Sequence, residues 1–157
     1  MRVWLWFSLL GLLASGTARA DELRPGYLEI TQQGARIWHV RLKAPVQGGL
    51  AANGNPAMPG FCTAGPPARR IEQGALYSDW RYDCAQSLVG AKVGLSGLDK
   101  TVTDALVRIA TLGRPVQAAR LTSSAPMTEV AARAGSAQVA GTYLALGIEH
   151  ILSLIHI

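Results

Sequence analysis

The chain has 157 residues, of which 49% are hydrophobic and 16% are charged, so it is long enough for one domain with a buried core. Its formal net charge is +5, but the basic residues are scattered and form a single doublet, Arg69-Arg70. Binding of nucleic acid needs basic side chains clustered on one face. The composition therefore argues against a nucleic-acid-binding protein.

Residues 1–20 have the pattern of a secretory signal peptide. A positive start precedes an apolar run over 3–13, and an A-x-A cleavage sequence follows at 18–20. The apolar run is too short to span a bilayer comfortably, which disfavours the alternative of an uncleaved anchor. We expect cleavage between Ala20 and Asp21 and export of the mature chain.

Residues 21–126 show the alternation of apolar and polar side chains that is typical of β-strands. The runs 27–32 and 36–43 are separated by a glycine turn, which predicts a hairpin with one wet face. His39 falls on that wet face, and we interpret it as a surface histidine rather than a ligand.

A Gly- and Pro-rich segment over 45–59 predicts a long loop. The strand expected over 76–84 carries Trp80, which we interpret as the central core aromatic, with a ligand-stacking role as the alternative. Three further strands are expected, over 89–95, 105–111 and 116–122. Because no helical period appears that could supply crossovers, the pattern predicts a mainly β fold, a small antiparallel β-sandwich.

Two cysteines, Cys62 and Cys84, belong to this exported part. An even number of cysteines in an exported chain favours a disulfide. The bond would close a loop of 21 intervening residues (63–83) and stabilise the fold by about 3 kcal/mol. The alternatives are two free buried thiols or, less favoured because no further ligand is near, a zinc site.

The β region contains no nucleophile elbow, phosphate loop, H-E-x-x-H sequence or dinucleotide fingerprint. Asp79 and Asp83 would share the outer face of one strand with Arg81 between them. Such a pair could bind a cation, but an exposed ladder of charges is the favoured interpretation. We therefore predict that the chain is not an enzyme.

The C-terminal part changes character. Residues 127–137 are small and Ala-rich and predict a linker, and residues 138–157 are largely apolar and predict the start of a transmembrane helix. This apolar stretch carries Glu149 and His150, and ionisable groups are costly within a bilayer, so they point to function. The alternative is that both are polar groups where the helix meets the membrane surface.

Three stretches carry a family resemblance: LRPGYLEI at 23–30, LDKTVTDALVRI at 98–109 and TYLALGIEHI at 142–151. Their order and wording resemble the HupE/UreJ-like family of bacterial membrane proteins, in the branch with an exported β domain ahead of the membrane helices. The third stretch is the most specific, because Gly-Ile-Glu-His opens that family's first membrane helix.

The resemblance implies an inner-membrane protein with its β domain in the periplasm, concerned with nickel or cobalt uptake or with maturation of hydrogenase and urease. It also implies that Glu149 and His150 form half of a transition-metal site. The second half, Gly-x-Asp-His, is not matched, since His156 has no preceding Asp. A divalent ion needs four or more ligands, so we expect no tight metal binding by these two residues alone.

The last six residues, 152–157, read LSLIHI, which is the translation of the end of a transposase sequencing adapter. We therefore expect a truncated gene, with the rest of the membrane domain as the natural partner of this part. The alternative function is a secreted β-sandwich binding module with a C-terminal membrane-docking helix. Further apolar segments of about 20 residues downstream would favour the first hypothesis.

Overall fold

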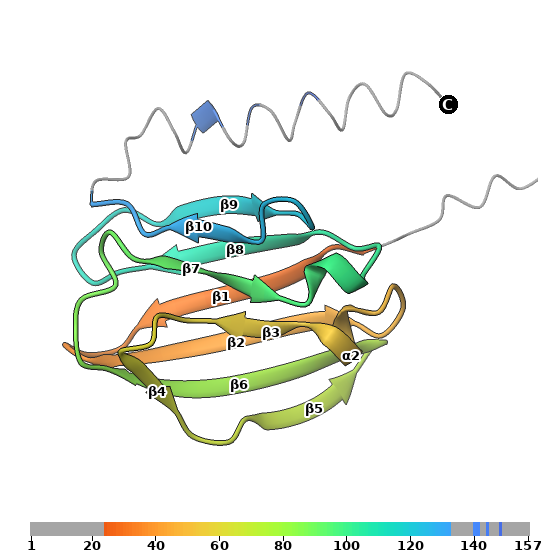
Figure 1. Ribbon diagram of the computed structural model, residues 1–157, viewed down its shortest axis with the longest axis horizontal. Helices are drawn as coiled ribbons and strands as arrows, with labels where there is room; N and C mark the ends of the chain where they lie inside the picture. The colour runs from red at the N-terminus through yellow and green to blue at the C-terminus, as the bar shows by residue number, and fades with distance from the viewer. Residues whose placement is uncertain (1–23, 133–139, 142–143, 145–147, 149–157) are drawn as a thin grey trace, which may run out of the picture.

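The computed structural model describes residues 24–132, 140–141, 144 and 148 (Figure 1). The predicted signal peptide, its cleavage site at Ala20 and Asp21, and the pair Glu149 and His150 lie outside the described residues. Most of the predicted transmembrane segment over 138–157 lies outside them too. In the part that the structure describes, no helix combines the length and the apolarity needed to cross a membrane.

The described chain is mainly β, with its strands divided between two sheets. The larger sheet has the order β4-β6-β2-β1-β8-β9, and β5 also pairs with β6. Its strands are β1 (Gly26–Gln32), β2 (Ile37–Pro45), β4 (Cys62–Ala64), β5 (Ala68–Glu72), β6 (Ala75–Cys84), β8 (Ala105–Ala110) and β9 (Gln117–Leu121). The smaller sheet has the order β10-β7-β3, from β3 (Asn55–Ala57), β7 (Lys92–Ser96) and β10 (Met127–Glu129). A short helix, α2 (Leu50–Asn53), and one turn of 3-10 helix, η1 (Leu98–Lys100), complete the described elements.

The predicted hairpin is confirmed, with Ile30 opposite Val40 in the antiparallel pair β1–β2. The prediction of a wholly antiparallel fold is wrong, because β1 and β8 pair in parallel, with Ile30 opposite Ile109. The cause is β7, which lies in the other sheet and carries the chain back to the end where β1 begins. Alternation of side chains cannot distinguish parallel from antiparallel pairing, so the sequence did not indicate this crossover.

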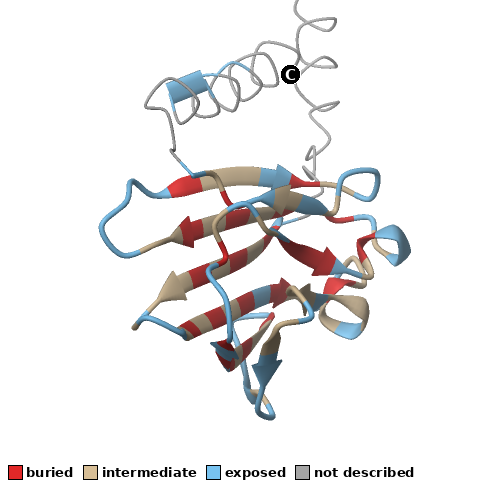
Figure 2. Cartoon of the chain, turned by 60° about the vertical axis from the view of Figure 1, so that its left-hand side comes forward, coloured by how far each residue is buried: buried red, intermediate tan, exposed pale blue. Residues whose placement is uncertain are grey.

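The two sheets contribute to one buried core. Figure 2 shows buried and more exposed residues alternating along the strands of the larger sheet. Trp38, Val40 and Leu42 are buried as predicted, and Val93 and Leu95 of β7 belong to the same core cluster. Each such side chain contributes roughly 1.5–3 kcal/mol when it leaves water. Trp80 is 8% exposed and packs in this core, which confirms the core interpretation.

The expected loop over 45–59 contains both α2 and β3, and fully buried Leu50 fixes α2 to the core. The strand expected over 89–95 begins later, at Lys92. Gly94 lies at the centre of β7, opposite both Met127 of β10 and Ala57 of β3. A Cβ at this position would lie 2.8 Å from the Cα of Met127, so only glycine allows this close approach of strands.

The predicted boundary at residue 126 is corrected by β10. Met127–Glu129 pairs with β7, and Val130 is buried in the core. The β domain therefore extends into the range that the Ala-rich composition assigned to a linker. The strand is too short to show a period, and its pairing with β7 rather than its propensity determines its structure.

Candidate functional site

The residues predicted to form half of a metal site, Glu149 and His150, lie outside the described part of the chain. Within residues 24–132 and the few described positions after them, no three His, Cys, Asp or Glu side chains come together in a group that could hold a metal ion. Polar or sulfur-containing groups gather at three other places in the described residues: the disulfide, the polar face of the larger sheet, and the point where the chain leaves the β domain.

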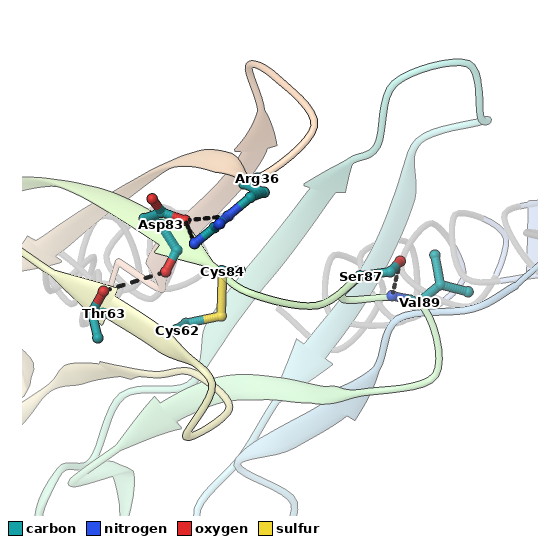
Figure 3. Close-up of a disulfide and its surroundings, with 7 residues drawn as sticks. All are labelled: Arg36, Cys62, Thr63, Asp83, Cys84, Ser87 and Val89. Carbon is teal, nitrogen blue, oxygen red and sulfur yellow. Dashed lines mark hydrogen bonds and ion pairs between the residues drawn. A yellow bond between two sulfur atoms is a disulfide. The ribbon is translucent and has the colours of Figure 1, made fainter.

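The predicted disulfide is confirmed, joining Cys62 to Cys84 (Figure 3). The two cysteines lie directly opposite each other in the antiparallel pair β4–β6. Cys84 is completely buried in the core, whereas Cys62 is partly exposed. The bond therefore attaches the three-residue edge strand β4 to the core through the last residue of β6.

Polar contacts surround the disulfide on its solvent side. Arg36 contacts Asp83 through two guanidinium nitrogens, with its Nη2 2.8 Å from the carboxylate (Figure 3). Thr63 donates a hydrogen bond from its hydroxyl to the carbonyl oxygen of Asp83, at 3.5 Å. Both cysteines are consumed by the disulfide, so this region has no thiol for redox or metal chemistry.

The outer polar face is the surface of the larger sheet that points away from the core, and Asp79 is its most paired residue. Its carboxylate accepts hydrogen bonds from Nε of Arg41 at 2.6 Å and from Nη1 of Arg70 at 2.9 Å. Nε2 of His39 lies 3.0 Å from the same carboxylate. These partners come from β2 and β5, the two strands that flank this part of β6.

Burial of the Asp79 carboxyl opposes its ionisation, but the hydrogen bonds from Arg41 and Arg70, together with the positive charge of Arg41, outweigh that effect and hold its pKa below the usual range. A carboxylate with a lowered pKa is a weak base. Its oxygens are already engaged by cationic side chains, so Asp79 is arranged as a structural ion-pair centre. Asp79 and Asp83 lie on the outer face of β6 as predicted, but the described partners of Asp79 are Arg41, Arg70 and His39 from neighbouring strands rather than Arg81 of its own strand.

An aromatic and cationic row crosses the same face. The ammonium of Lys43 lies 5.6 Å from the ring centroid of Tyr77, and the guanidinium of Arg70 lies 4.7 Å from it. The register explains the contact, because Tyr77 is opposite Lys43 on β2 and opposite Arg70 on β5. This row could not be predicted from the sequence, because β5 was not expected and the alternation of side chains does not specify the register between strands.

The chain leaves the β domain beside the β8–β9 turn. Gln117, which is largely buried, donates a hydrogen bond to the carbonyl oxygen of Glu129 at 2.7 Å and accepts one from the amide of Ala131 at 2.9 Å. Val130 exchanges backbone hydrogen bonds with the loop before β7. Arg114, in the β8–β9 turn, donates a hydrogen bond to the carbonyl oxygen of Ala132. Residues 129–132 are therefore fixed at one end of the domain.

Comparison of the chain with models of protein families finds no match, and comparison with curated proteins finds no match either.

Proposed function

We propose that this chain is the N-terminal, extracytoplasmic part of a membrane protein similar to the HupE/UreJ-like family. In this proposal the two sheets form a β-sandwich in the periplasm, and the apolar stretch 138–157 begins the membrane domain. The intact protein takes part in nickel or cobalt uptake or in metalloenzyme maturation. Glu149 and His150 supply half of the transition-metal site, and the remaining ligands come from later membrane helices.

The observation that carries the proposal is the order of parts along the chain. A disulfide-bonded β domain comes first, its exit is fixed at residues 129–132, and the apolar stretch with Gly147-Ile-Glu-His150 follows after a short connection. A disulfide is stable in an oxidising compartment, which supports export. The common core of the two sheets supports the sandwich.

The test is metal accumulation by cells that express the intact gene with His150→Ala. The proposal expects loss of nickel or cobalt accumulation, because an imidazole ligand is removed from the site. The matched control is His39→Ala, which removes an imidazole from the outer polar face. Uptake that is unchanged by His150→Ala would refute the metal role, and equal loss in both variants would attribute the effect to folding.

The second candidate is a secreted binding module that docks to a membrane through its C-terminal helix. The observation in its favour is the row formed by Lys43, Tyr77 and Arg70, since two cationic side chains held beside one aromatic ring form a positively charged site where an anionic ligand can bind. The sequence of the intact gene separates the two candidates. Several further apolar segments of about 20 residues favour the membrane protein, whereas a stop codon soon after the first favours the module.

A further inference from the structure

The β8–β9 turn exposes apolar side chains at the end where the chain leaves the domain. Leu112 is 59% exposed and Val116 is 37% exposed. Arg114 lies between them in the sequence and is also exposed. Two apolar side chains with a basic one between them can contact the interfacial layer of a phospholipid bilayer, because acyl chains and phosphate groups lie close together in that layer.

Several connections meet at this end of the domain, which we call the exit end. It comprises the turns 33–36 and 111–116, the loop 85–91 and the exit segment 129–132. The parallel pairing of β1 with β8 brings the first two together, and the side-chain oxygen of Gln32 accepts a hydrogen bond from the amide of Leu112 at 3.0 Å. Figure 1 shows these connections on the same side of the molecule, at the left.

The fixed exit limits how far this end can lie from a membrane. Only residues 133–137 separate Ala132 from the first residue of the apolar stretch, Gln138, and such a connection spans at most roughly 20 Å. The opposite end, which includes Val102, lies about 20 Å further away because strand β8 separates it from Leu112. The exit end is therefore the part of the domain that the tether holds closest to a bilayer.

We propose that the exit end faces the bilayer and that Leu112 and Val116 enter the headgroup layer, with Arg114 beside the lipid phosphates. This inference rests on the proposed function, because it requires the apolar stretch to insert in the membrane. It adds a lipid-contacting surface on the β domain itself. The occupant of the surface is the phospholipid layer, and contact with other membrane helices of the intact protein is the rival outcome.

The test uses the full chain with a single added cysteine, Leu112→Cys, labelled with an environment-sensitive fluorophore while the native disulfide stays oxidised. The chain is incorporated into vesicles of phosphatidylethanolamine and phosphatidylglycerol that contain a lipid with a nitroxide at the headgroup. The matched control is Val102→Cys, which places the same label at a position 74% exposed at the opposite end. Val116→Cys serves as a second reporter of the turn.

The proposal expects the labels at 112 and 116 to be quenched several-fold more strongly than the label at 102. Flotation of the vesicles first establishes whether the chain is membrane-bound. If the chain floats but the labels at 112 and 102 are quenched alike, the lipid-contacting turn is refuted and the proposed function stands. If the chain does not float with the vesicles, both the proposed function and this inference fail.

Discussion

Removal of the disulfide is the perturbation whose size follows most directly from the structure. The variant carries Cys62→Ala together with Cys84→Ala. The bond joins residues separated by 22 positions in the sequence, and loop entropy for a closed loop of this length gives about 3 kcal/mol. Because Cys84 is fully buried in the core, loss of its sulfur leaves a small void that adds about 1 kcal/mol. We expect the free energy of unfolding to fall by about 4 kcal/mol.

Urea unfolding followed by tryptophan fluorescence measures this change, since Trp38 and Trp80 are both buried in the core. The control is the wild-type chain reduced with a thiol, which keeps both sulfur atoms and loses only the cross-link. Its free energy of unfolding should fall by about 3 kcal/mol. Identical unfolding midpoints for oxidised and reduced protein would refute the reasoning, as would two titratable thiols in denatured, unreduced protein.

Three further predictions concern polar groups. Asp79→Asn should lower the free energy of unfolding by about 1–2 kcal/mol, since it leaves the guanidinium groups of Arg41 and Arg70 without their counter-ion. Asp83→Asn, at a side chain that is 48% exposed, should cost less than about 0.5 kcal/mol, and equal urea midpoints for the two variants would contradict this. The lowered pKa of Asp79 means that its contribution to stability is complete above the unfolded pKa and is lost as pH falls through the folded value. Burial raises the pKa of Tyr82. The contribution of its neutral hydroxyl to the free energy of unfolding is therefore complete below the unfolded pKa and is lost as pH rises through the folded value. Tyr82→Phe should flatten the alkaline side of a curve of stability against pH. Gln117→Leu removes two hydrogen bonds to the exit segment and should lower the free energy of unfolding by about 2–3 kcal/mol, with faster amide exchange at residues 129–132. The control Gln32→Leu removes two hydrogen bonds at a more exposed turn and should lower it by about 1 kcal/mol.

The long strands could be predicted from the sequence because the apolar residues of each strand alternate with polar ones and so mark the face that is buried. Over 37–42 and 105–109, side chains at alternate positions are buried by the core, and the alternation of apolar residues records this directly. The disulfide could be predicted for a different reason, since an even number of cysteines in an exported chain leaves few alternatives. Neither the strands nor the disulfide had to be predicted from a knowledge of which strands are neighbours.

The short strands could not be predicted, because strands of three to five residues in Gly- and Pro-rich segments are too short to show a period. They are stabilised by pairing with longer strands: β6 is long enough to pair with both β4 and β5 along one edge. The partners of Asp79 were missed for the same reason. Arg70 reaches it only because β5 exists, and Arg41 only because β2 and β6 pair in this register.

The orientation proposed for the domain separates the two surfaces proposed on it, the lipid-contacting turn and the row formed by Lys43, Tyr77 and Arg70. With the exit end at the bilayer, the strands of this sheet run away from the membrane and its outer polar face is open to the side. Arg36 and Asp83 lie at the end of the sheet near the bilayer, whereas Lys43 and Tyr77 lie near its far end, because β2 runs from Ile37 to Pro45 away from the exit end. An anionic ligand bound at Lys43, Tyr77 and Arg70 would therefore be held away from the lipid, and Tyr77→Ala should weaken its binding without changing the quenching of a label at Leu112.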